Sequence, residues 1–528
     1  MQAHAEKRMV KEEHLLEQIT KLPNLQSAWV MPSQSAVPRA NHTIRTLPPS
    51  ASSAYAAKHD AAVWNTFCKV MSAEDALDDD LAHQVATLPG RLGGLGLRST
   101  QRSAPAAYWA SWVDALSVIQ TKAPDIAARI VEELDSSTIG TPCLQEASDG
   151  LEELCAQGTA DLPTWAEAAK GIRPPPPDEG TDAADLDRGW QCHACSTFEQ
   201  NFLEHVVRPS SDTSRRSLLL SQAGGPASAW LRAIPSEPAF TLTPLRLQVA
   251  LRRRLRWRLP LSGGMCCRGC HKTLDPLGDR AAACAMSGRI KLRSRPLEKT
   301  WARVMRESGA RVRENVFLRD TAVPNIDPSD GRRIEVVATG LPIARGIPVA
   351  VDATLVSPLH ADGTPFSGAD TKAGISFRRA ERSKVTTYPE LVNSSLLQLL
   401  TVASETGGRL NRDGCNLLVD AAAARARTEP AVLRKAAARG WRTRWTTMVS
   451  VCVQNALAST LVDDGTTLLD AADGPAPLAV DVWLNSRTEA TSAAAARSTQ
   501  QEDVDEATAL AFPPASLWPS AVAVAAVA

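Results

Sequence analysis

The chain has 528 residues, a formal net charge of zero and 44% hydrophobic residues, which is enough for two to four domains with buried cores. No apolar run reaches the length of a membrane span, and the charged N-terminus is unlike a secretory signal. These features argue against the membrane and secreted classes. We therefore expect a nuclear or cytoplasmic protein whose 11 cysteines stay reduced, so that paired cysteines indicate metal binding or no special role rather than disulfides.

The zero net charge hides an asymmetry along the chain. Residues 240–320 hold 19 Lys and Arg against 6 Asp and Glu, a local charge of +13. Residues 466–528 carry eight acidic residues and two Arg, a local charge of −6, and we expect an acidic, Ala-rich disordered tail there. The basic stretch predicts contact with a phosphate backbone; a solvated helix face or an acidic partner is the alternative.

The first 150 residues are predicted to be mainly helical. Apolar residues recur at helical spacing over 8–22, and residues 53–88 and 104–133 form further helical blocks. Residues 30–52 are rich in Pro and Ser and predict a loop. The segment LPGRLGGLGL at 88–97 predicts a tight turn because it holds four glycines, and it lacks the Gly-Lys-Ser/Thr ending of a phosphate loop.

Residues 171–187, rich in Pro and acids, predict a linker. The C-x2-C pair at 192–195 has no partner pair at zinc-finger spacing, so we expect two cysteines on an amphipathic helix. Residues 243–259 predict a second amphipathic helix with a Leu stripe and many Arg. Either the Arg grip phosphates while the Trp stacks on a base, or the Leu stripe packs and the Arg stay in water. The candidate nucleic-acid-binding residues are Arg252, Arg253, Arg254, Arg256, Trp257 and Arg258.

A cysteine cluster follows this helix. Cys267 and Cys270 form a C-x2-C pair, and Cys284 follows after a gap of thirteen residues. This spacing is typical of a small zinc knuckle, because zinc takes sulfur and imidazole ligands from short turns. The usual His before the last Cys is missing: Arg280 is among the residues there, and Arg does not bind a cation.

After about residue 296 the pattern changes to mixed helices and short β-type runs. We predict strands at 312–318, 333–338 and 348–358, and helices at 296–309, 370–386, 389–404 and within 416–460. The expected fold is α+β: a mostly α-helical N-terminal half, a small zinc-knuckle-like segment and an α/β domain. The predicted segments are 1–150, 151–260, 261–295, 296–465 and 466–528.

Two acidic residues stand on predicted strands. Glu335 lies in the second run, and Asp352 interrupts the otherwise apolar third run. A buried carboxylate is costly without a partner, so Asp352 should be paired, hydrogen-bonded or metal-bound. Lys384 and Tyr388 follow near the end of the next helix. Two carboxylates and a Lys suit a Mg²⁺-dependent phosphodiesterase, and a structural ion pair is the alternative.

The order of these features resembles the C-terminal part of site-specific non-LTR retrotransposon proteins that carry a restriction-like endonuclease. The resemblance covers roughly residues 10–460. It rests on Pro38–His42, His59-Asp60, Leu88–Leu97, Ala106–Ala110, Cys267-x2-Cys270, Leu274–Asp279, Cys284, Asp352–Pro358 and Lys384-x3-Tyr388. In that family a reverse transcriptase precedes a thumb and helical linker, a Cys-Cys-His-Cys knuckle and a PD-(D/E)XK nuclease.

The resemblance implies roles for residues of this chain. Cys267, Cys270 and Cys284 would be zinc ligands, the His position falls at Arg280, and His271 and Cys266 are the neighbouring substitutes. Glu335 stands where the family has an Asp, and it would hold Mg²⁺ together with Asp352. Lys384 and Tyr388 match the family's Lys-Tyr motif and complete the catalytic set. The implied partners are DNA, the element RNA and a full-length element protein.

The polymerase palm of that family is missing. Asp78–Asp80 lie in a helical stretch rather than in a hairpin, and Asp463-Asp464 come after the nuclease-like region. We therefore expect a truncated retroelement product without polymerase activity. Three hypotheses stay open: a Mg²⁺-dependent DNA-nicking enzyme, an inactive relic that binds nucleic acid, or a helical scaffold whose acids pair with Arg332 and Arg333.

Overall fold

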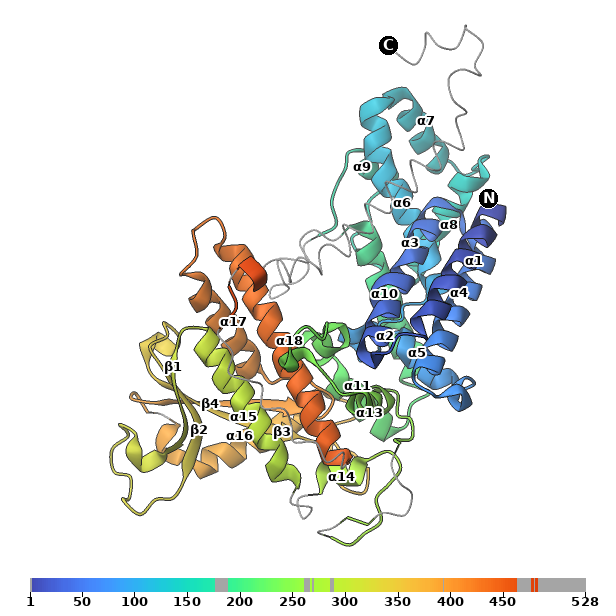
Figure 1. Cartoon of the computed structure of the whole chain (residues 1–528). Helices are drawn as coiled ribbons and strands as arrows, with labels where there is room; N and C mark the ends of the chain where they lie inside the picture. Colours follow the sequence, from blue (N-terminus) through green and yellow to red (C-terminus); the bar gives the residue numbers. More distant parts are fainter. Residues whose placement is uncertain are drawn as a thin grey trace.

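A mixed α+β architecture, 61% helical with one four-stranded sheet, confirms the predicted fold class. The computed structural model describes residues 2–175, 189–260, 266–267, 270–284, 289–392, 394–462, 476–478 and 480–482. Most of the predicted linker at 171–187, nearly all of the acidic tail and the Asp463-Asp464 pair lie outside these residues. In Figure 1 the N-terminal helices gather at one end of the molecule and the sheet lies at the other.

The N-terminal end is a helical assembly. Side chains cap four of its helices, because Asn24, Asp79, Ser99 and Thr164 each accept a hydrogen bond from a free backbone N–H of the first turn. The helices are α1 (Gln2–Ile19), α2 (Leu25–Met31), α3 (Val37–Thr46), α4 (Pro49–Val70), α5 (Asp80–Thr87), α6 (Thr100–Lys122), α7 (Pro124–Leu134), α8 (Pro142–Ala156), α9 (Trp165–Ala169) and α10 (Trp190–Phe202).

The prediction of a loop over 30–52 is wrong. A π-helical turn at Pro32–Ala36 joins α2 to α3, and α4 begins at Pro49. Pro38 and Pro49 fall in first turns, where a missing backbone N–H costs nothing. The apolar residues of α3 face the core, and this burial stabilises a helix where the composition suggested a loop. The prolines therefore stand at helix starts.

The middle of the chain connects the helical assembly to the sheet. Its helices are α11 (Thr213–Gln222), α12 (Gly225–Ser228), α13 (Pro244–Arg254) and α14 (Asp279–Ala283). The Leu stripe of α13 is buried, as predicted, and belongs to a core with Trp29, Trp64, Phe67 and Trp257. Short 3-10 turns at Ala229–Arg232 and Pro238–Phe240 lie between α12 and α13.

The sheet has the order β1-β2-β3-β4, with bounds Arg311–Phe317, Arg333–Thr339, Val349–Val356 and Gln398–Glu405. β2 is antiparallel to both of its neighbours, β1 and β3, whereas β4 is parallel to β3. One face packs against α15 (Arg289–Glu307) and α18 (Arg434–Leu461) through a core that includes Val351, Trp301 and Trp445. The fold also has α16 (Ile375–Thr387), which contacts β3 and β4, and α17 (Arg412–Ala426) (Figure 1).

The helix predicted over 389–404 is wrong. Among the residues of 389–404 that the structure describes, only the turn Pro389–Leu391 is helical, and Gln398–Glu405 forms β4. β4 pairs with every residue of β3 in parallel, which buries Val402 and Ala403. A short apolar run suits a helix or a buried strand equally well, and here tertiary pairing decided between them.

Helix α18 contributes residues to the core beside the sheet and to the core of the helical assembly, and so connects the two ends of the molecule. Its residues Trp441 and Trp445 belong to the core beside the sheet, whereas Val451 belongs to the core of the helical assembly. A buried charge network supports the junction: Arg444 pairs with Glu307 of α15 and with Glu237 from the segment before α13.

Candidate active site and thiol cluster

Glu335 and Asp352 lie side by side on adjacent strands. In the antiparallel pair β2–β3, Val337 is opposite Ala350 and Val336 is opposite Val351, and Glu335 and Asp352 are the next residues on their strands. Because side chains alternate between the faces of a sheet, Glu335 and Asp352 lie on the same face as Val337 and Ala350. The charge of Asp352 raises the pKa of Glu335, as expected for neighbouring carboxyl groups. The backbone N–H of Ala353 donates to Glu335 Oε2 at 2.6 Å, which ties the two strands at this point.

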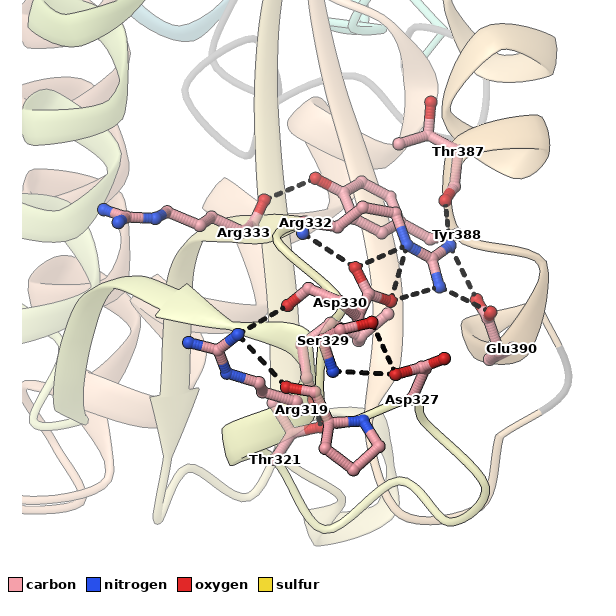
Figure 2. A network of polar contacts seen from close by, with 12 residues as sticks. Arg319, Thr321, Asp327, Ser329, Asp330, Arg332, Arg333, Thr387, Tyr388 and Glu390 are labelled. Atoms are coloured by element: carbon pink, nitrogen blue, oxygen red, sulfur yellow. Dashed lines mark hydrogen bonds and ion pairs between the residues drawn. The ribbon is translucent and has the colours of Figure 1, made fainter.

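Helix α16 adds Lys384 and Tyr388 to the two carboxylates. Lys384 Nζ pairs with Asp352 Oδ1, which confirms that the buried Asp352 has a partner. The hydroxyl of Tyr388, the residue that ends α16, donates to the backbone carbonyl of Arg333 at 2.5 Å (Figure 2). Burial, with Asp352 and Glu335 nearby, raises the pKa of Tyr388. All four predicted catalytic residues therefore converge.

The site holds more carboxyl groups than cationic groups. Burial, followed by the charge of Asp352, raises the pKa of Glu335 to about 9, although Lys384 acts in the opposite direction. Asp352 is fully buried, and its Oδ2 has no hydrogen-bond donor among the described residues. A charged carboxylate that is buried in this way needs further compensation, which a cation would supply.

Glu298 of α15 is a third acid, which the sequence reasoning missed. Its pKa is raised by burial and by the nearby charge of Asp352. Nothing in the helical pattern around 296–309 distinguishes it, because its approach to Asp352 depends on how α15 packs on the sheet. The exposed Arg295 lies one turn earlier and lowers the same pKa.

The arginines before Glu335 do not neutralise these acids, so the pairing proposed for the scaffold hypothesis is wrong. Arg332 pairs with Asp330 and with Glu390, and it also donates to the carbonyl of Thr387 at 2.5 Å (Figure 2). The guanidinium of Arg333 lies over the ring of Phe317 at 4.0 Å. The ion pair between Asp352 and Lys384, in contrast, fits a structural role as well as a catalytic one.

The oxygen donors of the acidic site suit Mg²⁺, which prefers carboxylate ligands and water. Glu335 and Asp352 are the two residues that could hold it. Among the described residues, only Cys267, Cys270 and Cys284 form a group of three or more metal-type ligands with all ligand atoms within 4.8 Å. The three carboxylates therefore do not jointly surround one ion in this conformation.

Most of the residues predicted to bind nucleic acid are buried or bound to other parts of the protein, so the prediction of a nucleic-acid-binding helix is wrong for them. Arg253, Arg254 and Trp257 are buried, and a buried side chain cannot reach a phosphate or a base. Arg254 donates to the carbonyls of Gly90, Gly94, Gln222 and Ala227, and burial lowers its pKa to about 9.

The neighbouring residues have structural partners too. Arg253 and Arg256 pair with Asp279, and Arg252 donates to the carbonyls of Met71, Ser72 and Arg258. Trp257 stacks on Phe67, and its indole N–H donates to Asp79. Of the six candidates only Arg258 is exposed. The alternative with the Arg in water is also wrong, because these guanidinium groups bind backbone carbonyls and carboxylates.

The three predicted zinc ligands converge. The Sγ atoms of Cys267 and Cys284 are 3.7 Å apart, and Cys270 completes the group. A backbone hydrogen bond at Lys272, with the other two thiols and Arg280, lowers the pKa of Cys270 to about 7. Neither Cys266 nor His271 joins the group, and both are exposed.

The remaining motifs have structural roles. Cys192 and Cys195 lie on α10, as predicted. Asp79 caps α5, so Asp78–Asp80 form no polymerase hairpin. The glycine turn at 88–97 is closely packed: a Cβ on Gly94 would lie 2.1 Å from the carbonyl oxygen of Leu88.

No protein-family model matches this chain, and the curated proteins yield no match. Within the part that the structure describes, none of the helices combines the length and the apolar character that a membrane crossing requires.

Proposed function

We propose that this protein is a Mg²⁺-dependent DNA-nicking endonuclease whose site comprises Glu335, Asp352 and Lys384. The observation that carries the proposal is the convergence of two strand carboxyl groups, one of them the fully buried Asp352, with the ammonium group of Lys384. Such a surplus of buried carboxylate oxygens favours a divalent cation. A bound Mg²⁺ would polarise the phosphate and lower the pKa of a water ligand.

In the proposed cleavage of DNA, each of the site residues would have a separate role. Asp352 and Glu335 would bind the ion through their carboxylates. Lys384, already held beside Asp352, would orient the attacking water or stabilise charge on the phosphate. Tyr388 would position the end of α16, because its hydroxyl is bound to the backbone of β2.

The same proposal covers the origin of the chain. The order of a helical half, a three-cysteine segment and a domain with these acids supports a truncated non-LTR retrotransposon product. Residues 1–150 would be a thumb-like remnant, 151–260 a linker and 296–465 the nuclease. DNA would be the partner, together with the element RNA or a full-length element protein. This chain alone would not polymerise DNA.

A non-catalytic relic is the second candidate, and one observation favours it. A Glu335 pKa of about 9 means that this carboxyl is largely protonated at neutral pH without a cation, which weakens its grip on Mg²⁺. A relic would retain nucleic-acid binding and lose cleavage.

The test is nicking of supercoiled DNA by the purified chain with and without Mg²⁺. We expect Mg²⁺-dependent nicking that falls at least a hundredfold in Asp352→Asn, since loss of a catalytic metal ligand removes several kcal/mol of stabilisation. Asp320→Asn is the matched control, because Asp320 is an exposed acid in the turn after β1. Equal nicking by native protein and Asp352→Asn would contradict the proposal, and DNA binding without any nicking would favour the relic.

A further inference from the structure

The three-thiol cluster has the dimensions of a metal site. Zinc–sulfur bonds of about 2.3 Å in a tetrahedron place two thiolates about 3.8 Å apart. The 3.7 Å between the Sγ atoms of Cys267 and Cys284 matches this spacing and is far longer than a disulfide bond of about 2.05 Å. Cys267 and Cys284 are buried and Cys270 is half-buried, so the donor set is enclosed on most sides.

No fourth protein ligand completes the group within the described part of the chain. Cys266 is exposed and pairs with Thr273 through a backbone bridge, and His271 is exposed with a left-handed backbone. The fourth position therefore stays available to a small molecule from solvent, as in the open zinc sites of enzymes.

Arg280 lies where a fourth ligand would be expected. It lies in α14, and Cys284 is the residue directly after this short helix. The side chain of Arg280 is hydrogen-bonded to Cys270. The N–H of Arg280 donates to Asp275 Oδ2 at 2.7 Å, which fixes the start of the helix. Three thiolates around a divalent cation carry one excess negative charge, and a guanidinium carries one positive charge.

We propose that Cys267, Cys270 and Cys284 bind one divalent thiophilic cation such as Zn²⁺, with Arg280 as counter-charge and the fourth coordination position open to a small exogenous ligand. The positive charge of Arg280 thus balances the excess negative charge of the three thiolates, and Arg280 is not a defect of the site. The proposal is independent of the acidic site, and its readout does not involve DNA cleavage.

The probe is Co²⁺, titrated into the reduced full chain and followed by its thiolate charge-transfer and visible d–d absorption. We expect one Co²⁺ per chain, displaced by Zn²⁺. Addition of imidazole should change the d–d bands of the native complex, because imidazole occupies the open position.

Three variants of Arg280 distinguish its role as a counter-charge from the effect of a fourth metal ligand at its position. Arg280→Lys should keep the affinity, whereas Arg280→Gln should weaken it roughly tenfold, because the counter-charge is lost. Arg280→His should bind more tightly, and its bands should no longer respond to imidazole. Cys266→Ser and His271→Ala are controls and should leave the bands unchanged, and circular dichroism of every variant reports its folding.

Three results would overturn the proposal. Stoichiometric Co²⁺ binding by Arg280→His but not by the native chain would show that Arg280 blocks the site. Equal affinity of Arg280→Gln and the native chain would remove the counter-charge role. A native spectrum that ignores imidazole, or that changes in Cys266→Ser or His271→Ala, would show that the fourth position is filled by the protein.

Discussion

Metal binding at the acidic site should expel a proton from Glu335. Burial and the charge of Asp352 raise the pKa of Glu335 to about 9, so about one chain in a hundred carries the ionised form at pH 7. An ion that needs both carboxylates must displace this proton, at a cost of about 2.7 kcal/mol at pH 7. The apparent affinity for Mg²⁺ should therefore rise about tenfold for each pH unit up to about 9 and then level off.

Calorimetry of Mg²⁺ binding in buffers of different ionisation enthalpy counts the protons released, without DNA. We expect close to one proton per ion at pH 7 and little release above pH 10. Glu335→Gln should lose most of the affinity and the proton release together, whereas the control Asp320→Asn should behave as the native chain. Binding without proton release, or equal release in Glu335→Gln, would refute the reasoning.

The raised pKa of Glu335 also predicts how the free energy of unfolding depends on pH. Above the unfolded value near 4.5 the folded chain holds the Glu335 proton more tightly than the unfolded chain does. The stability that this carboxyl contributes is thus present below pH 4.5 and is lost as the pH rises towards 9. Glu335→Gln should flatten the fall in the free energy of unfolding between pH 6 and 9, measured by urea denaturation. A pH dependence identical to that of the native chain would contradict the burial of this group.

Three further changes test the structure. Arg254→Met should lower the free energy of unfolding by about 3–5 kcal/mol, because four buried carbonyls lose their donor, whereas the exposed Arg258→Met should stay within about 0.5 kcal/mol in the same urea titration. Tyr388→Phe should cost about 1 kcal/mol through its lost hydrogen bond to β2, and an unchanged urea midpoint would contradict that bond. Under the proposed function, DNA lies at the acidic site, and we expect the exposed Arg295, one turn before Glu298, to contact its backbone. Arg295→Gln should then reduce the salt slope of DNA binding by about 0.9, whereas Arg378→Gln on the exposed face of α16 should not.

The acidic site shows which residues can be predicted from the local sequence pattern and which cannot. Alternation in the strand around Asp352 predicted one apolar face and a carboxylate on the other, and the pairing of β2 with β3 agrees. Lys384 came from a motif near a helix end, and it does reach Asp352. Glu298 could not be found in this way, because its distance from Asp352 depends on the packing of α15 against the sheet.

The basic helix shows the opposite case. The sequence predicted its amphipathic form and its buried Leu stripe correctly, since both follow from a period of 3.6 residues. It could not predict that the Arg side chains would be buried. An Arg is as suitable for backbone carbonyls as for phosphate, and only the loop at 88–97, folded against α13, provides the carbonyls of Gly90 and Gly94.

By itself, the sequence determined the fold class, three of the four strands, four of the residues that meet at the acidic site and the three cysteines of the thiol cluster. These features follow from local periodicity and from short ligand spacings. The tertiary structure alone decided that residues 398–405 form a strand, that the prolines of 30–52 begin helices and that Arg253, Arg254 and Trp257 are internal. In each case the deciding contact comes from a segment distant in the chain, and local propensity carries no information about such a contact.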